Sequence, residues 1–374
     1  MSTKRKLLLG LDFKFSFVLV ILLVLGSIII YSASYPSALS QYGDGSYYLK
    51  RHLIFLALGV FFMLFLSMVK VEKIKKFTPV FFGLCLALLV IVLFLGSSEG
   101  VAKRWLGIPG TPLSFQPSEL MKLGVVLMLS WYYNKSNAKA NSVLNQIIVP
   151  GILLFTSCGL VLLEKHLSGT VIIALIGLSV IFCSGASVKR MILYYGTVLV
   201  AGAGAFLLTN EYALKRISSF FDSNADVLSD KWQTTQGLFA IGSGGLFGLG
   251  IGNSRQKFSY VSEPQNDFIF TIWCEETGFV GAVILITLFL VLILNGYRIA
   301  NKSKDKFAFL TSFGITTQVG IQAILNIAVV TDLLPNTGIS LPFFSYGGSS
   351  AVILLIEMGI ILSISRENKE MNIK

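Results

Sequence analysis

Charged residues are scarce in this sequence. Only 13% of its 374 residues are Asp, Glu, Lys or Arg, about half of the share that an ordinary soluble domain carries. Histidine occurs twice, which is too few for a histidine metal cluster. The four cysteines lie inside apolar runs without a paired spacing, which favours small buried side chains over disulfides or metal ligands. These shortages argue against an ordinary soluble enzyme and against a metal centre built from Cys or His.

Long runs of apolar residues make up much of the sequence. Apolar residues make up 54% of the chain, and the mean hydropathy is +0.76. A membrane-spanning helix needs about 20 apolar residues, whereas the strands of a membrane barrel would alternate in polarity. The sequence therefore predicts an all-α polytopic membrane protein with about ten transmembrane helices. The apolar runs are 15–33, 52–69, 78–96, 120–133, 147–163, 169–185, 191–208, 268–296, 307–329 and 348–364.

One long polar insertion interrupts this pattern. We expect residues 1–374 to form a single integral membrane domain, with 209–266 as a large extracytoplasmic loop between spans seven and eight. The first run follows three basic residues, as in a signal peptide. Its length and the many later spans favour an uncleaved first helix.

The net charge of +11 carries topological information. If the N-terminus is cytoplasmic, the short inner loops hold 19 of the 30 Lys and Arg residues but only five of the 19 acidic residues. An excess of Lys and Arg in short loops marks the cytoplasmic side, so we expect both termini to be cytoplasmic. The basic balance therefore gives no indication of nucleic-acid binding.

Several ionisable residues lie at membrane depth, where insertion costs about 2.5–3.5 kcal/mol each and suggests function. Glu119 and Lys122 are three residues apart and share a helix face. They form either a structural ion pair that joins two spans or part of a substrate-lining surface. Glu275, Glu276 and Glu357 also lie at or inside span boundaries.

Asp267 is placed at the start of the eighth apolar run, directly before Phe268. Asp is among the best N-cap residues, so one interpretation is a helix cap. The other is a carboxylate at the membrane–water boundary that serves as a general base toward a lipid-linked substrate. The two roles are compatible, because a cap also fixes the direction of the carboxylate.

Glycines and cations share the long loop. The run from Gly242 to Gly252 lacks the spacing of a nucleotide-binding loop and follows no predicted strand, so it indicates a flexible or close-packed segment. Arg216, Arg255 and Lys257 lie on the same loop, with Lys231. Such cations either hold a pyrophosphate or are simply solvated.

A series of short motifs occupies the outer loops and the ends of the spans. They are Arg104-Trp105, Gln116-Pro117-Ser118-Glu119, Gln256-Lys257, Glu263-Pro264, Asp267-Phe268-Ile269-Phe270, Glu275-Glu276, Leu334-Pro335, Thr337-Gly338, Leu341-Pro342-Phe343 and Ser345-Tyr346-Gly347-Gly348-Ser349-Ser350. In this order they resemble the SEDS family of cell-wall proteins, which includes FtsW, RodA and SpoVE. The resemblance covers roughly residues 15–365. Residues 253–258 and 265–267 are more similar to the FtsW and SpoVE branch, which favours division or sporulation over elongation.

The resemblance implies a peptidoglycan glycosyltransferase of the bacterial cytoplasmic membrane. Such an enzyme polymerises lipid II into glycan strands at the outer face. The essential aspartate of the family corresponds to Asp267, and the carboxylate of its Gln-Pro-Ser-Glu motif corresponds to Glu119. Family members work with a single-span transpeptidase of the penicillin-binding class. Other division or sporulation membrane proteins are further expected partners.

The expected chemistry is an inverting glycosyl transfer with Asp267 as the general base. The leaving group is undecaprenyl pyrophosphate, whose developing charge needs nearby cations. The candidate substrate-binding residues are Arg104, Gln116, Glu119, Lys122, Arg216, Arg255 and Lys257. No metal ligand set and no cofactor is identified, and a requirement for a divalent cation stays open.

Some positions depart from the family pattern. Residues 164–170 stand where the family usually has a turn with Pro and Asp, and both are missing here. Asp332 and Asn336 stand where Gly and Val are usual, and 271–274 replace a small-residue stretch. These departures favour one competing hypothesis, a non-catalytic scaffold for a transpeptidase. The other is a lipid II flippase or transporter, which charges near the membrane midplane and broken helices would suit, although the polar motifs gather on one face.

Overall fold

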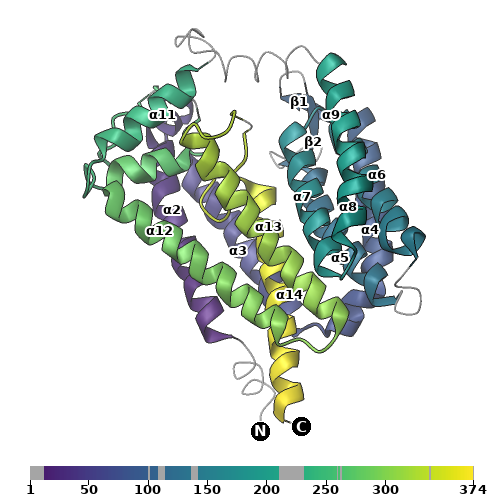
Figure 1. The fold of residues 1–374 in the computed structure, drawn as a ribbon. Coiled ribbons are helices and arrows are strands. Elements are labelled where there is room, and N and C mark those ends of the chain that lie inside the picture. Colours follow the sequence, from purple (N-terminus) through teal and green to yellow (C-terminus); the bar gives the residue numbers. More distant parts are fainter. Residues whose placement is uncertain are drawn as a thin grey trace.

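The computed structural model describes residues 12–99, 102–107, 114–135, 142–209, 231–258, 260–261, 263–336 and 338–373. Each of the ten predicted apolar runs overlaps a helical segment (Figure 1). The main helices are α2 (Phe13–Tyr42), α3 (Tyr47–Met68), α4 (Val71–Leu95), α5 (Pro117–Lys135), α6 (Val149–Leu163), α7 (Leu167–Cys183), α9 (Thr197–Thr209), α12 (Ile269–Asn301), α13 (Lys306–Val330) and α14 (Gly348–Ile373). A π-helical turn, Leu144–Ile148, precedes α6, while α8 (Val188–Met191) and a second π-helical turn, Ile192–Gly196, precede α9.

Seven helices among the described residues are long and apolar enough to cross a membrane by length and composition. A helix satisfies its own backbone hydrogen bonds, which is what a segment surrounded by lipid requires. The prediction of an all-α multi-pass membrane protein is confirmed. The number of ten spans stays a prediction.

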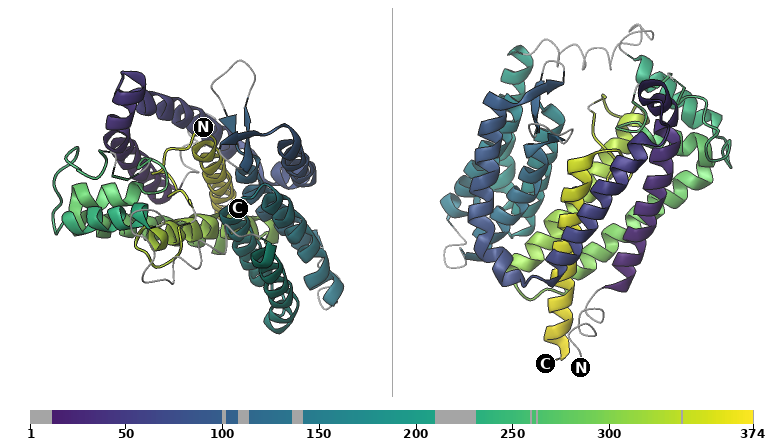
Figure 2. Two further views of the ribbon diagram at one scale, coloured as in Figure 1. Left: turned by 90° about the horizontal axis from the view of Figure 1, so that it is seen from above. Right: turned by 180° about the vertical axis from the view of Figure 1, so that it is seen from behind.

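Helices α13 and α14 lie between two groups of helices, as Figures 1 and 2 show. In their most apolar windows 61% of α13 and 78% of α14 is buried, compared with 22% for α3 and 28% for α4. Helix α5 connects the two hydrophobic cores. Leu123 and Val126 pack in the core with α2, α3 and α12–α14, whereas Met121 and Val125 pack in the core with α4, α6 and α7. The central helices thus pack against protein while α3 and α4 present apolar side chains to lipid.

Polar side chains join the helices at the end that carries both termini (Figure 1). Arg298 pairs with Asp12 at 2.7 Å, which ties the end of α12 to the start of α2. The backbone N–H of Val71 donates to Glu367 at 2.7 Å, which ties α4 to α14. These residues were all predicted to be cytoplasmic, and the structure places them together at one end of the bundle. The side of the membrane that this end faces stays a prediction.

A small antiparallel sheet stands between α4 and α5, where no strand was predicted. Its strands are β1 (Ser97–Glu99), β2 (Ala102–Gly107) and β3 (Ser114–Phe115), in the order β1-β2-β3. Ser97 faces Trp105 across the first pair, and Leu106 faces Phe115 across the second. Strands this short show no alternation of polarity that could have revealed them. The sheet positions the Arg104-Trp105 motif just before α5.

The described part of the predicted loop 209–266 contains helix α11 (Trp232–Ser243) and a tightly packed glycine segment. The glycine segment packs against a break in α12 at Gly278, where φ is 70° and ψ is −168°. The amide of Leu249 donates to the carbonyl of Glu275 at 3.0 Å, and the amide of Val280 donates to that of Leu246 at 3.1 Å. These bonds satisfy backbone groups that the broken helix leaves unpaired. The glycine run is therefore the close-packed segment that the sequence analysis considered.

Gly278→Ala should destabilise the protein by about 1–3 kcal/mol, because its dihedral angles are nearly exclusive to glycine. An added Cβ would also overlap backbone atoms of Leu246 and Gly248. Thermal unfolding in detergent measures the effect. The control is Gly83→Ala in α4, where an added Cβ meets nothing within 4 Å and which should be neutral or stabilising. Equal unfolding temperatures for the two variants would contradict the prediction.

Candidate functional site

The loop before α12 carries the predicted catalytic carboxylate. Helix α12 begins at Ile269 with Phe268 as its N-cap residue, so the interpretation of Asp267 as the helix cap is wrong. Phe268 takes that position because its ring is fully buried, which turns the preceding residue out of the helix. Asp267 is half-buried. Its carboxylate is therefore directed by the loop rather than by the helix terminus.

Neighbouring elements hold this loop in place. The Asn326 side chain, on α13, donates to the backbone carbonyls of Asp267 and Ile339, each at 2.7 Å. The amide of Tyr346 donates to the carbonyl of Gln265 at 2.8 Å. A Cβ added to Gly338 would lie 3.6 Å from the Asp267 carboxylate, so the glycine backbone lies close to it. The carboxylate thus sits in a loop fixed from two sides.

Amide oxygens around Asp267 have no donor among the described residues. They belong to Gln265, Asn266 and Asn326, and all three oxygens are buried. The other end of the Asn266 amide donates to Glu263 at 2.7 Å, which fixes its orientation. Buried polar atoms without a partner are rare and call for an explanation. Within the described part of the chain they are unsatisfied acceptors in the protein interior beside the Asp267 loop.

A second polar cluster lies at the start of α5. The Lys122 ammonium lies 2.8 Å from the Glu119 carboxylate, and the two side chains are 4% and 12% exposed. The Ser350 side chain, in the first turn of α14, lies beside Glu119. Nδ1 of His166 lies 3.3 Å from the Gln116 amide and 3.2 Å from the Ser118 hydroxyl. The predicted residues Glu119 and Lys122 therefore form a buried pair, and half-buried Gln116 contacts His166 just before the same helix.

The beginning of α14 connects the two polar clusters. Tyr346, just before the helix, contacts the loop of Asp267 through Gln265, while Ser350, in its first turn, contacts Glu119. The structure thus brings the Asp267 loop and the Glu119–Lys122 pair to the same end of the bundle, on either side of the start of α14.

Arg104 lies over the turn between α6 and α7. Its guanidinium donates to the carbonyl of Lys165, a non-glycine residue with φ of 57°. Glu164, next to it, is 2% exposed, and neither of its carboxylate oxygens has a hydrogen-bond partner in the described residues. Burial raises the pKa of Glu164 from 4.5 to about 8, against the opposing effect of Arg104. Burial and the neighbouring Arg104 lower the pKa of His166 from 6.5 to about 4.

These shifts predict a dependence of stability on pH. The folded protein retains a proton on Glu164 that the unfolded chain releases, so the stability from this group is complete below pH 4.5 and is lost as the pH rises to about 8. His166 acts in the opposite direction, with stability lost as the pH falls from 6.5 to about 4. The two effects oppose each other at acidic pH. Above pH 6.5 only the loss from Glu164 continues.

Glu164→Gln should therefore stabilise the protein relative to the wild type by about 2 kcal/mol more at pH 8 than at pH 6.5. The amide cannot ionise, so it avoids the cost of burying a carboxylate. Thermal unfolding of the purified protein at a series of pH values measures this difference. Glu370→Gln, whose parent side chain is 67% exposed, is the control and should show no such trend. Parallel pH profiles for Glu164→Gln and the wild type would contradict the prediction.

The cations of the long loop are placed differently from Arg104 and Lys122. Lys257 is buried, and its ammonium contacts Glu276 at 3.1 Å, Ser32 at 3.0 Å and the carbonyl of Gly252 at 2.6 Å. Arg255 is exposed, while its backbone N–H donates to the Glu275 carboxylate at 2.9 Å. Both residues thus lie beside the broken part of α12. Arg216 lies outside the described residues.

A cavity of about 760 Å³ opens beside Lys257. Its walls come from α2, α3 and the loop at 251–258, and they are mostly apolar. Ser32 and Lys257 supply polar groups on one wall, while Tyr31 and Tyr35 are both about 40% exposed. None of the residues that line this cavity belongs to the clusters around Asp267 and Glu119. Among the described residues, no three His, Cys, Asp or Glu side chains gather as a metal site would require.

Two residues of the site were missed by the sequence analysis. His166 was considered only as a metal ligand, yet it joins the turn before α7 to the Gln-Pro-Ser-Glu motif. Asn326 lies inside an apolar run, and a polar side chain in such a run is itself a signal of function. That signal could have identified Asn326. The contact of His166 could not be found from sequence, because 48 residues separate it from Ser118.

Fold and site together define a multi-pass helical membrane protein with polar clusters gathered at one end of the bundle. The family model described as cell cycle protein, which groups FtsW, RodA and SpoVE, matches residues 13–370, and the chain belongs to this family. The resemblance inferred from the motifs is thereby confirmed.

Individual relatives match along nearly the whole chain. Stage V sporulation protein E of Bacillus subtilis is 35% identical over 373 residues, which cover 99% of this chain and 100% of the relative. The probable peptidoglycan glycosyltransferase FtsW of Bacillus subtilis is 34% identical, covering 96% of this chain and 92% of the relative. Another probable peptidoglycan glycosyltransferase FtsW, from Geobacter sp. strain M18, is 35% identical, covering 95% and 97%.

Solved structures share the fold. The rod shape determining protein RodA of Thermus thermophilus has a TM-score of 0.70 and 26% identity, with 96% of this chain and 97% of that chain covered. A chain from a peptidoglycan synthase complex that polymerises and crosslinks has a TM-score of 0.79 and 24% identity, covering 96% and 98%. The arrangement of helices described above is therefore that of known members of the family.

Proposed function

We propose that this protein is a peptidoglycan glycosyltransferase that polymerises lipid II at the outer face of the bacterial cytoplasmic membrane, in division or sporulation. Relatives named as such glycosyltransferases or as a sporulation protein support this. The observation that carries the proposal is the fixed loop of Asp267, which holds a half-buried carboxylate at the polar end of the bundle. A carboxylate held in this way acts as a base toward a sugar hydroxyl.

In the proposed reaction Asp267 takes the proton of the glucosamine 4-hydroxyl of the acceptor lipid II. That oxygen forms a bond to the anomeric carbon of the terminal sugar of the growing chain, and the bond to the pyrophosphate breaks. The configuration inverts from α to β, and undecaprenyl pyrophosphate leaves. Because the leaving group is already good, no second carboxylic acid is needed, unlike in glycoside hydrolysis.

The remaining candidates act on the substrate's charge and position. We assign Arg104, Lys122, Arg216 and Arg255 to the pyrophosphate groups, where cations stabilise the developing charge. Gln116 and Glu119 orient the sugar or hold Lys122. Lys257, whose ammonium is surrounded by three acceptors, would serve by holding the loop or by turning to the phosphate. A single-span penicillin-binding transpeptidase is the proposed partner, with the peptidoglycan synthase complex as the structural precedent.

Purified full-length protein, alone and with its cognate transpeptidase, should convert labelled lipid II to polymer on a gel. The same preparation in vesicles reports whether lipid II moves between leaflets. Movement without polymer would favour the transporter. Absence of both activities, or equal polymer from the wild type and Asp267→Asn with the transpeptidase present, would favour the scaffold. The Pro and Asp missing from residues 164–170 are the sequence feature that favours the scaffold hypothesis.

A further inference from the structure

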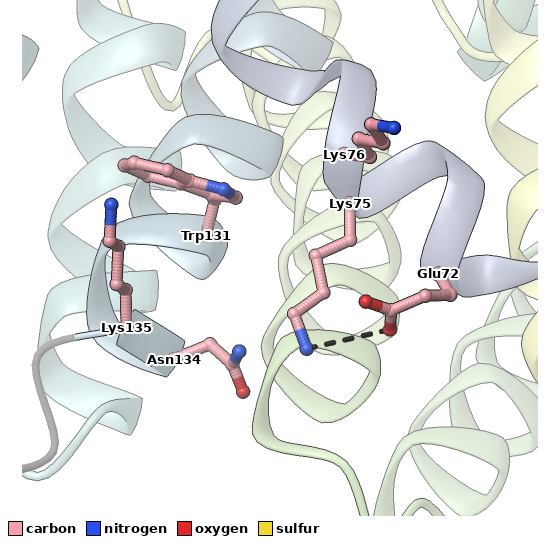
Figure 3. A pocket seen from close by; sticks show the side chains of 6 residues that line it. All are labelled: Glu72, Lys75, Lys76, Trp131, Asn134 and Lys135. Atoms are coloured by element: carbon pink, nitrogen blue, oxygen red, sulfur yellow. Dashed lines mark ion pairs between the residues drawn. The ribbon is translucent and has the colours of Figure 1, made fainter.

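A hollow lies between the first turns of α4 and the last turn of α5, at the end of the bundle that carries both termini. It encloses about 350 Å³ and is lined by Glu72, Lys75, Lys76, Trp131, Asn134 and Lys135 (Figure 3). Glu119 is in the first turn of α5 and Lys135 is its last residue, roughly 24 Å away along the axis. The hollow is therefore remote from the proposed active site.

The three lysines of this hollow differ in their partners. The Lys75 ammonium lies 3.5 Å from Asp305 and 3.8 Å from Glu72, so its charge is already compensated within the protein. Lys76 and Lys135 are exposed and, within the described ranges, have no carboxylate within ion-pair distance. The Lys135 ammonium lies 4.9 Å from the centre of the Trp131 ring. The hollow thus retains positive charge that an anion can neutralise.

An apolar stripe continues from the hollow along α4. Phe77, Val80 and Leu84 are 64%, 71% and 54% exposed, and their spacing places them on one helix face. Val80 and Leu84 stand four and eight residues after Lys76, so the stripe continues from that lysine along one side of α4. Trp131 adds an aromatic ring on the α5 side, as is common where a protein meets the membrane–water interface. The complementary ligand has an anionic head and an apolar chain.

We propose that this hollow binds the phosphate headgroup of an anionic glycerophospholipid, with an acyl chain along Phe77, Val80 and Leu84. Lys76 lines the hollow from α4 and Lys135 lines it from α5, and a bound phosphate would draw the Lys76 ammonium, which is turned away from Lys135, toward it (Figure 3). Basic pockets between transmembrane helices are suited to such headgroups, and lysine binds phosphate as a point charge. A soluble phosphate would use the lysines but leave the apolar stripe unused.

Native mass spectrometry of the full-length protein with phosphatidylglycerol and phosphatidylcholine tests the proposal. The wild type should retain phosphatidylglycerol in preference to phosphatidylcholine. The double variant Lys76→Gln/Lys135→Gln should bind phosphatidylglycerol roughly 10- to 30-fold more weakly, as expected for two lysine–phosphate contacts. The control Lys73→Gln/Lys302→Gln removes the same charge from exposed positions at the same end and should keep the preference.

Two further measurements make the outcome unambiguous. Thermal unfolding in phosphatidylcholine should be the same for the two double variants, which shows that lost binding is not lost folding. Inorganic phosphate added in excess should fail to displace the lipid. Equal retention of phosphatidylglycerol by the wild type and by Lys76→Gln/Lys135→Gln would overturn the proposal. Displacement of the lipid by inorganic phosphate would also overturn it and would identify a site for free phosphate.

Discussion

Replacing Asp267 by Asn is expected to lower the rate of lipid II polymerisation by about 10²- to 10⁴-fold, the usual contribution of a general base. The amide has nearly the shape of the carboxylate but cannot accept the proton of the attacking hydroxyl. The contact that fixes this loop goes to the backbone carbonyl of Asp267, so the substitution leaves it in place. Initial rates from gel-resolved polymer measure the effect, and thermal unfolding should be nearly unchanged.

Asp332→Asn provides the matched control. Asp332 is an exposed aspartate of the last loop, with φ of 58°, a conformation that Asn adopts readily. The same change of charge at this position should leave the rate at the wild-type level. If Asp267→Asn polymerised lipid II as fast as Asp332→Asn, Asp267 would not be the general base.

Lys122→Met is expected to destabilise the protein by about 3–5 kcal/mol, because it leaves a buried carboxylate without its counter-charge. Lys122 and Glu119 are 4% and 12% exposed and 2.8 Å apart. Glu357 of α14 is also fully buried, and both of its oxygens accept hydrogen bonds from the Gln318 amide at 2.8 and 2.9 Å. Removing the lysine therefore leaves the carboxyl groups of Glu119 and Glu357 buried without its positive charge. Thermal unfolding in detergent measures the loss.

The double variant Lys122→Met/Glu119→Gln separates the structural role of this pair from its role in substrate binding. Neutral residues of similar size avoid the uncompensated charge, so most of the stability should return. Polymerisation should stay about 10²-fold below the wild type, because the cation that stabilises the pyrophosphate is missing. Recovery of both stability and polymerisation would show that this pair, whose two residues both lie on α5, has only a structural role, and it would remove both residues from the proposed site.

The helices were predictable because the membrane simplifies the problem. A long apolar run in lipid must satisfy its own backbone, so the run itself indicates a helix. The runs at 120–133, 147–163 and 169–185 are short for single spans, so their boundaries were the least certain from sequence. Helix α5 is largely buried and carries a charged residue in its first turn, while α6 follows a π-helical turn. The break at Gly278 was not predicted, since its cause is the glycine segment packed against it.

The candidate site was predictable as a set of residues but less so as an arrangement. Spacing was sufficient for Glu119 and Lys122, which pair as two residues on one helix face. It was insufficient for Lys257, whose contacts with Ser32 and Glu276 join α2, the long loop and α12. Ser32 and Glu276 are 244 residues apart in the sequence. Contacts of this kind depend on the tertiary fold, and no local pattern records them.

The cap assigned to Asp267 shows a related difficulty. Asp favours N-cap positions when local backbone preference decides. Here the burial of Phe268 and the hydrogen bonds from Asn326 decide instead, and the helix begins one residue later than that interpretation required. The carboxylate is thereby released from a structural role at the helix terminus, which is consistent with a role in proton transfer.

The most direct test of the proposed function is the linkage of the product that the purified wild-type protein forms from lipid II. The proposed reaction inverts the anomeric carbon, so the polymer should be digested completely by a muramidase that cleaves β-1,4 linkages. Asp267→Asn, assayed beside it, should form polymer about 10²- to 10⁴-fold more slowly. A polymer that resists this enzyme, or no polymer from a folded wild type supplied with its transpeptidase, would contradict the account.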